Sequence, residues 1–212
     1  MKKLLLAIFA LTTISSFAEG NFNLYTKVGV DLSSKFSKFI DDPIPLKAKH
    51  AYSFFLEGTK NITPNLEIGT GLGYIARKGK DYSFIDDGTR IHGELPTYNS
   101  IPLYLTTKFN FETGNELKPF IKADLGYSFN KLKNKTEYED GKAVVYDNIN
   151  SFDFSKATNG LYAGIGIGTE YKNFVIDLSY TLTKSKIKWT DGSSEKYNNK
   201  AIRLSVGYKF NF

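Results

Sequence analysis

Two histidines, His50 and His92, are the only imidazoles in the sequence, and there is no cysteine. The absence of cysteine excludes a thiolate nucleophile and a thiolate metal site. A catalytic serine would therefore need one of these two histidines as its base. Ser53 is the serine nearest to His50 in the sequence, but their odd separation places the two side chains on opposite faces of an extended strand. We expect no catalytic residue and interpret both histidines as ordinary rim or loop residues.

Acidic clusters at 41–42, 86–87 and 137–140 offer carboxylates that could bind Ca²⁺. None of them has the residue spacing of a known calcium loop, so we interpret them as solvated loop tips. The glycine-rich run 69–73 (GTGLG) lacks the Lys-Ser/Thr pair of a phosphate-binding loop and continues the alternation of a strand. We therefore predict no metal site and no cofactor.

Other charged side chains, outside these acidic clusters, recur at every second position of extended segments. Lys27 and Asp31 share one parity, whereas Val28 and Val30 hold the other. This period of two is typical of a strand with one polar and one apolar face. Over the whole sequence the polar face carries six cations and six anions, namely Lys27, Asp31, Glu57, Glu67, Arg77, Lys108, Lys122, Asp124, Glu170, Asp177, Arg203 and Lys209.

Eight segments show the same alternation, and the composition supports strands, with 17 Phe, 14 Tyr and 18 Gly. The eight segments are 22–33, 52–57, 66–77, 100–111, 121–129, 160–171, 174–182 and 202–212. Three of the connections are short (61–65, 112–118 and 172–173), and four are long and polar (34–48, 78–98, 131–158 and 184–198). Short turns at one end and long loops at the other are typical of an outer-membrane barrel. The sequence thus predicts an all-β fold, an eight-stranded antiparallel up-and-down transmembrane β-barrel over residues 19–212.

Three of the long connections contain Asp-Gly, at 87–88, 140–141 and 191–192. This dipeptide favours a tight hairpin turn, so we expect the strand pairs to continue beyond the membrane as protruding ribbons with unpaired edges.

The direction of the apolar face separates a membrane barrel from a soluble barrel of the lipocalin type. An inward apolar face would crowd many Phe, Tyr and β-branched residues into one small cavity, so lipid is the better partner for it. Aromatic residues also gather near the strand ends, as at the two interfaces of a bilayer. We therefore predict that the twelve charged residues form a paired network in the lumen.

Residues 1–18 have the build of an export signal. Lys2 and Lys3 precede an apolar run at 4–14 that is too short to span a bilayer, and Ser16 and Ala18 supply small residues at the positions that a signal peptidase recognises before a cleavage point after Ala18. The alternative is an N-terminal anchor helix. Loss of Lys2 and Lys3 would leave 26 Lys and Arg against 22 Asp and Glu, a net charge of +4 that does not indicate nucleic-acid binding.

The sequence ends on an alternating segment in which Ser205, Gly207, Phe210 and Phe212 stand at the positions of an outer-membrane insertion signal. In this respect the chain resembles the small OmpA/OmpX-like outer-membrane β-barrel proteins of Gram-negative bacteria. The resemblance implies a place in the bacterial outer membrane, contact with its lipid and lipopolysaccharide, and recognition of the C-terminal strand by the barrel assembly machinery.

The resemblance leaves the function open between classes. The OmpX type implies a non-enzymatic envelope protein whose extracellular loops contact another protein or surface. The OmpW type would imply a narrow channel for small or hydrophobic solutes, and a lipid-modifying barrel enzyme is a more distant alternative. The lumen of an eight-stranded barrel is just wide enough for side chains, and the twelve charges with Tyr104 and Tyr162 would fill much of it. We therefore favour surface interaction through the long loops, whose aromatic residues include Tyr82, Phe84, Tyr138, Tyr146 and Trp189.

Overall fold

The computed structural model describes residues 22–37, 47–79, 81–86, 89–94, 97–133, 137–139, 142–144, 154–189 and 192–212. Eight strands close into one barrel, which confirms the predicted fold class. They are β1 (Phe22–Phe36), β2 (Ala48–Asn61), β3 (Leu66–Gly79), β6 (Thr97–Asn110), β7 (Leu117–Lys133), β11 (Gly160–Tyr171), β12 (Phe174–Thr183) and β15 (Asn199–Asn211). No helix in the described part of the chain is long and apolar enough to span a membrane.

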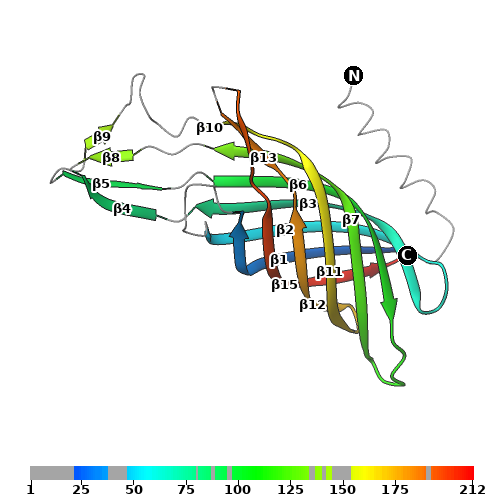
Figure 1. The fold of residues 1–212 in the computed structure, drawn as a ribbon. Coiled ribbons are helices and arrows are strands. Elements are labelled where there is room, and N and C mark those ends of the chain that lie inside the picture. The colour runs from blue at the N-terminus through cyan, green and yellow to red at the C-terminus, as the bar shows by residue number, and fades with distance from the viewer. Residues whose placement is uncertain are drawn as a thin grey trace.

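Each barrel strand pairs antiparallel with its neighbours, in the order β1-β15-β12-β11-β7-β6-β3-β2 (Figure 1). The first and last strands close the barrel through a long register in which Leu24 lies opposite Phe210 and Val28 opposite Val206. Because consecutive barrel strands are spatial neighbours, the topology is the predicted up-and-down arrangement.

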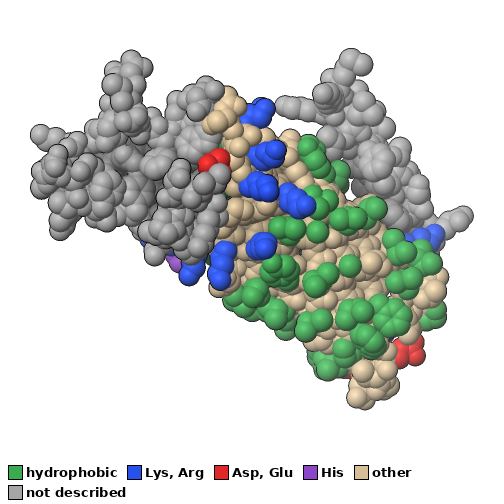
Figure 2. Space-filling model, viewed as in Figure 1, with side chains coloured by type: hydrophobic (Ala, Val, Ile, Leu, Met, Phe, Trp, Pro, Cys, Tyr) green, Lys and Arg blue, Asp and Glu red, His purple; other side chains and the backbone are tan. Residues whose placement is uncertain are grey.

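The two faces of each strand differ as the alternation predicts. On β12, Val175, Asp177 and Ser179 are buried, whereas Ile176 and Leu178 are exposed. Figure 2 shows hydrophobic side chains spread over the face of the barrel wall that is in view. Aromatic pairs such as Phe109 with Phe111 and Phe174 with Tyr208 lie on this exterior toward the short turns. The exterior is therefore an apolar band edged by aromatic rings, which suits a bilayer.

The short connections lie at one end of the barrel (Figure 1). They are 62–65 between β2 and β3, 111–116 between β6 and β7, and the two-residue turn Lys172-Asn173 between β11 and β12. Lys172 has a φ of 55°, the left-handed conformation that so tight a hairpin requires.

Within the described residues, seven further strands lie in the long connections at the other end. They are β4 (Asp81–Asp86), β5 (Thr89–Glu94), β8 (Glu137–Glu139), β9 (Lys142–Val144), β10 (Phe154–Ala157), β13 (Lys186–Trp189) and β14 (Ser194–Lys196). β4 pairs with β5, β8 with β9 and β13 with β14, so paired strands flank all three Asp-Gly dipeptides, as predicted. Gly192, in the third of these turns, has a φ of 86°.

The expectation that these ribbons keep free edges is partly wrong. β5 pairs with β8 through Ile91 opposite Glu139 and His92 opposite Tyr138, so two long connections share one four-stranded sheet, β4-β5-β8-β9. β10 and β13 likewise join two connections in a three-stranded sheet, β10-β13-β14. The export signal predicted at 1–18 and the loop residue Tyr146 lie outside the described residues.

Candidate functional site

The structure places the side chains of all twelve predicted charged residues inside the barrel. Each is at most 13% exposed, the largest value being that of Lys209. They fall into three networks stacked along the barrel axis, which we call the turn-end, middle and loop-end networks. Burial of this kind disfavours any charge that lacks a partner, so the arrangement of partners decides what the interior can do.

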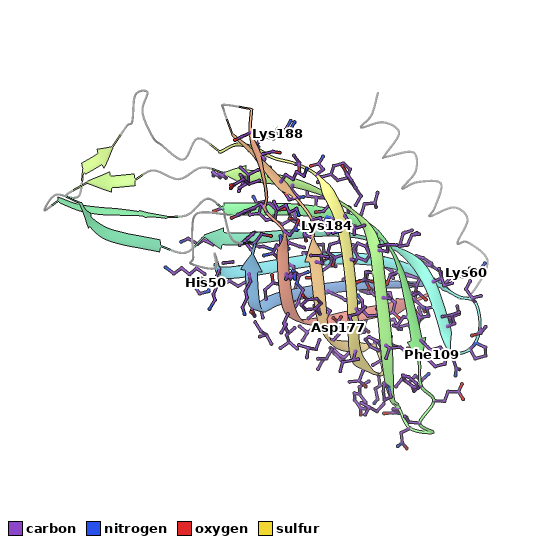
Figure 3. The ribbon with its side chains drawn as sticks, in the orientation of Figure 1. His50, Lys60, Phe109, Asp177, Lys184 and Lys188 are labelled. Carbon is purple, nitrogen blue, oxygen red and sulfur yellow. The ribbon has the colours of Figure 1, made fainter. Side chains whose placement is uncertain are left out.

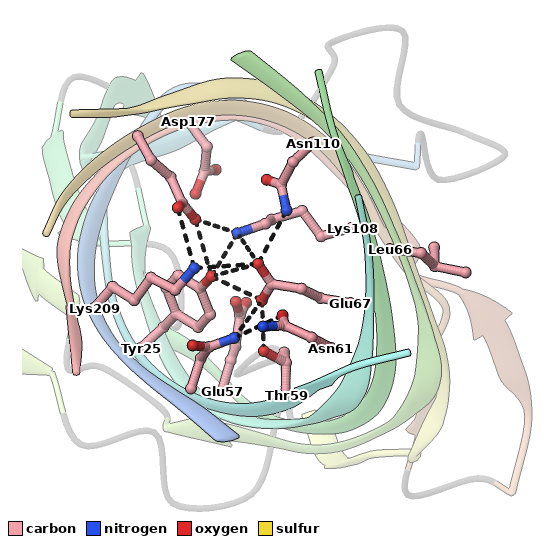
Figure 4. Close-up of polar contacts among 12 residues, drawn as sticks. Tyr25, Glu57, Thr59, Asn61, Leu66, Glu67, Lys108, Asn110, Asp177 and Lys209 are labelled. Carbon is pink, nitrogen blue, oxygen red and sulfur yellow. Dashed lines mark hydrogen bonds and ion pairs between the residues drawn. The ribbon is translucent and has the colours of Figure 1, made fainter. Parts of the chain in front are cut away.

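The turn-end network consists of Glu67, Glu170, Lys108 and Lys209. Figure 4 shows Glu67, Lys108 and Lys209 pointing toward one another inside the barrel. Lys108 forms ion pairs with both carboxylates, at 2.9 Å to Glu67 Oε1 and at close range to Glu170. Lys209 Nζ lies 3.2 Å from Glu67 Oε1 and 3.2 Å from Glu170 Oε2. Two ammonium groups and two carboxylates thus form a neutral ring that bridges β3, β6, β11 and β15.

Neutral polar side chains complete this ring, and sequence analysis missed them. The Tyr25 hydroxyl lies 2.8 Å from Glu67 Oε2 and 2.9 Å from Glu170 Oε1. Thr59 donates to Glu67 at 2.6 Å and Asn110 at 3.0 Å. Strand parity could have found them, because Tyr25 is two residues before Lys27 and Asn110 two residues after Lys108.

The middle network consists of Lys27, Glu57, Lys122, Asp124 and Asp177. Glu57 lies between two lysines, 2.6 Å from Lys27 Nζ and 3.0 Å from Lys122 Nζ. Lys27 also approaches Asp177 at 3.4 Å, and Lys122 approaches Asp124 at 3.2 Å. The network therefore holds three carboxylates for two ammonium groups.

The loop-end network consists of Asp31, Arg77 and Arg203. Arg203 Nε donates to Asp31 Oδ1 at 2.7 Å, and Arg203 Nη2 lies 2.7 Å from the same oxygen as an ion pair. Arg77 Nε lies 3.8 Å from Asp31 Oδ2, and Arg77 Nη1 donates to Ser100 at 2.8 Å. This network has two guanidinium groups for one carboxylate, so its excess positive charge balances the excess negative charge of the middle network.

Aromatic rings fill the space that the inward glycines leave. A Cβ added at Gly71 would lie 2.3 Å from the Tyr104 ring, and one added at Gly73 would lie 2.3 Å from the Phe55 ring. Tyr104 also packs on Tyr162, with ring centroids 5.2 Å apart. The cavity between the middle and loop-end networks is therefore small, about 10 Å³, close to the least space that holds one water molecule.

A hydrophobic cluster lies beyond the loop-end network, and we call it the lid. It contains Phe36, Tyr98, Ala157, Ile187 and Tyr197. The Phe36 ring stacks on the Tyr197 ring at 4.5 Å, and both lie 5.5 Å from the Tyr98 ring, which is itself 5.4 Å from the Arg77 guanidinium. Burial raises the pKa of the Tyr197 phenol. The long connections, interpreted from their sequence as polar loops, thus supply an apolar cover for the lumen.

The four residues of the proposed insertion signal lie on β15 or directly after it. Ser205 is buried, whereas Phe210 and Phe212 are exposed on the outer wall. The Phe212 amide donates to the Phe22 carbonyl at 2.9 Å, so the end of the chain is fixed to β1. A Cβ at Gly207 would lie 2.5 Å from the Thr26 carbonyl oxygen, which explains the glycine at this position.

The histidine and serine considered for catalysis do not meet. His50 is exposed and its ring lies 6.3 Å from that of Tyr52, whereas Ser53 is buried and donates to the Gly29 carbonyl at 3.2 Å. The backbone of His92 is described, but its side chain lies outside the described set. The described residues contain no group of three or more His, Asp or Glu side chains arranged to hold a metal ion.

A closed antiparallel barrel with an apolar exterior and a charged, filled interior defines a transmembrane β-barrel protein. Residues 4–210 match the family described as Outer membrane protein beta-barrel domain. The chain therefore belongs to this family, and it is a protein of the bacterial outer membrane. In such barrels the short turns face the periplasm and the long connections face the cell exterior.

One relative and several solved structures resemble the chain. An uncharacterized protein of Pasteurella multocida (strain Pm70) is 40% identical over 99% of this chain and 98% of its own length. Among solved structures, Neisserial surface protein A is 13% identical, with a TM-score of 0.49 over 90% of this chain and 97% of its own. The attachment invasion locus protein Ail of Yersinia pestis, in complex with the heparin analogue sucrose octasulfate, is 16% identical, with a TM-score of 0.47 over 90% of this chain and 99% of its own.

Proposed function

We propose that the protein is a non-enzymatic outer-membrane protein with a closed barrel, which uses its extracellular sheets to contact molecules outside the cell. The observation that carries the proposal is the filled lumen, in which the cavity between the middle and loop-end networks measures about 10 Å³. A conducting pore needs a continuous water path, whereas the three networks and the lid occupy successive levels of this barrel.

The paired charges also argue against a lumen that opens easily. A solute would have to separate Lys27 from Glu57, at 2.6 Å, and Arg203 from Asp31, at 2.7 Å. Separation of a buried pair leaves charges without partners, at a cost of about 3–5 kcal/mol for each pair. These pairs therefore favour a structural role over the alternative of a channel.

The extracellular sheets offer surfaces that the barrel itself does not. β4 and β9 are the outer strands of the four-stranded sheet, and their backbone groups can pair with a strand of another protein. The sequence of β4 includes Tyr82 and Phe84, residue types that are enriched in protein interfaces. The expected partner is accordingly an extracellular protein.

Export and assembly complete the proposal. Residues 1–18 would direct secretion and then be removed. The barrel assembly machinery would recognise the C-terminal strand and the residue that follows it, Phe212. Contact with outer-membrane lipid and lipopolysaccharide would follow from insertion.

The test replaces residues 81–94 and 134–153 with short turns and leaves β10, which carries the lid residue Ala157, in place. We expect the trimmed protein to reach the outer membrane and to keep heat-modifiable mobility in SDS electrophoresis. Bacteria that carry it should adhere to cultured epithelial cells or to one another less than bacteria with the full-length protein. Equal adhesion, with intact insertion, would contradict the proposal.

A further inference from the structure

The wall of the barrel is interrupted at the loop end, between β1 and β2. The two strands pair in register as far as Val30 and Tyr52, and they meet again at a bridge between Lys35 and Lys47. Between these two points, the described residues of β1 and β2 have no register pair. Backbone N–H and C=O groups that would pair in a continuous ladder therefore line a gap in the wall.

Two β-bulges hold the strands apart at this gap. On β1, Leu32 is an extra residue, inserted where the pairing with β15 shifts register. On β2, Lys49 is an extra residue, inserted where the pairing with β3 shifts register. A bulge bends its strand, and bulges are common at the rims of barrels and beside functional sites. The gap is thus formed by the backbone of both strands and not by the position of one side chain.

The gap opens into a hollow of about 220 Å³. Its lining consists of the residues along the two edges, 31–34 and 47–51. Figure 3 shows His50, on the second edge, at the end of β2 opposite Lys60. At about 30 Å³ for each water molecule, the hollow has room for about seven. Pockets for drug-sized ligands measure about 300–1,000 Å³, so this hollow suits a smaller molecule.

Asp31 gives the hollow a buried hydrogen-bond acceptor. Its side chain is 1% exposed, and its Oδ1 accepts a hydrogen bond from Arg203 Nε. Among the described residues, its Oδ2 has no hydrogen-bond partner, and Arg77 Nε, at 3.8 Å, is too distant to donate to it. A buried acceptor without a donor is unfavourable, so a ligand hydroxyl that donates to Oδ2 would be stabilised there.

The charged groups around the hollow favour an anion. Asp31 is neutralised by Arg203, and Arg77 adds a positive charge beside the pair. Lys47 and Lys49 are exposed and belong to the lining. Ammonium groups donate strong hydrogen bonds to carboxylate oxygens. A ligand with an anionic group at these two lysines and hydroxyl groups at its inner end would therefore match both parts of the hollow.

We propose that this hollow binds a small hydroxylated anion of the sugar-acid class, which arrives from outside the cell. The carboxylate contacts Lys47 and Lys49, one hydroxyl donates to Asp31 Oδ2, and the other hydroxyls pair with the backbone groups along the gap. A polyol suits these edges because each hydroxyl both donates and accepts, and a strand edge offers N–H and C=O groups together. The small volume favours a carboxylate over the larger phosphate.

The site is closed toward the lumen by the ion pair between Asp31 and Arg203, so the ligand binds without passing through the barrel. The proposal goes beyond the surface contact proposed above and does not depend on it, because it concerns the barrel wall and not the extracellular sheets.

The test measures binding by titration calorimetry to the full-length protein, refolded in a zwitterionic detergent that has no sugar headgroup. The probe is D-glucuronate, and two further compounds test the two parts of the hollow. D-Glucose lacks the anionic group, and propionate lacks the hydroxyl groups. Each should bind at least about tenfold more weakly than glucuronate, because each loses a hydrogen bond that involves a charged group of the protein.

Two variants test where the sugar acid binds. K47Q/K49Q removes both ammonium groups and should weaken glucuronate binding about tenfold or more, with little effect on glucose. Its matched control, K131Q/K133Q, removes two exposed lysines at the same end of β7, which is adjacent to neither β1 nor β2, and should stay within about twofold of wild type. Ser33→Phe fills the hollow and should abolish binding. Each variant is tested after it shows heat-modifiable mobility.

Methyl β-D-glucuronide distinguishes two sources of such a sugar. Binding as tight as that of glucuronate would support the terminal sugar of a glycan as the ligand, and much weaker binding would support the free acid. The proposal is overturned if glucuronate does not bind, if glucose binds as tightly as glucuronate, or if K47Q/K49Q and Ser33→Phe bind glucuronate as wild type does.

Discussion

Glu67 contacts more polar side chains than Glu170, the other carboxylate of the turn-end network. The substitution Glu67→Gln therefore tests directly whether the interior is a desolvated network. The Glu67 carboxylate is 2.9 Å from Lys108, 3.2 Å from Lys209 and 2.6 Å from Thr59, and its side chain is 2% exposed. The substitution removes one negative charge and leaves two lysines to share Glu170. Removal of one partner from a buried ion pair costs about 3–5 kcal/mol, and we expect a loss of this size in the free energy of unfolding.

The assay is reversible urea unfolding of the refolded protein in lipid vesicles. At each urea concentration the folded fraction is measured as the share of the protein that keeps heat-modifiable mobility in SDS electrophoresis. The matched control is Glu116→Gln, because Glu116 is also paired with a lysine, Lys172 at 3.8 Å, but its side chain is 62% exposed. An exposed pair contributes about 0–1 kcal/mol, so the control should move the midpoint little.

A double variant distinguishes charge balance from simple loss of packing. Lys209→Gln combined with Glu67→Gln restores neutrality, so the combined loss should be smaller than the sum of the two single losses. Equal midpoint shifts for Glu67→Gln and Glu116→Gln would refute the reasoning, since the interior would then not be a desolvated network.

Other changes probe the remaining levels of the barrel. Arg203→Ala removes the hydrogen-bonded ion-pair partner of the buried Asp31 carboxylate and should lower the free energy of unfolding by about 3–5 kcal/mol in the same urea assay; a loss below about 1 kcal/mol would mean that water reaches the loop-end network. A Cβ at Gly126 would lie 2.1 Å from the backbone oxygen of Leu103, so Gly126→Ala should greatly reduce the yield of folded protein. The control is Gly58→Ala, whose Cβ would meet only the tip of the Phe22 ring, at 3.1 Å, and which should fold in nearly the yield of wild type; similar yields of the compact band for the two variants would contradict the packing described. Phe36→Ala removes a ring from the lid and should make the segment 186–196 sensitive to added protease while the barrel stays resistant, and unchanged digestion would show that the lid does not hold this segment.

The alternation in the sequence was sufficient to predict the barrel because the bilayer and the lumen impose opposite demands on neighbouring residues. Lys27, Val28 and Asp31 show the pattern, and their side chains lie where strand parity places them. Strand parity places Tyr25 on the same inward face as Lys27. Its residue type gives no such signal, because most aromatic residues of these strands lie on the outer wall.

Two features could not be predicted from local pattern. The division of the charges into three networks depends on how far each strand is displaced along its neighbours, as when Glu67 of β3 meets Glu170 of β11 near the same lysines. The pairing of β5 with β8 and the lid around Phe36 join segments of different connections, and no periodicity relates such segments. Their residues carry the signal of a loop, and only the assembled barrel brings them together.

Single-channel recording of the refolded full-length protein in a planar bilayer tests the closed barrel most directly. The sample must first show the heat-modifiable band, so that an absence of current cannot result from unfolded protein. The filled lumen predicts no discrete, reproducible open state at any applied voltage that the bilayer tolerates. A stable unitary current of constant size would contradict this account and replace the surface-contact function with a channel.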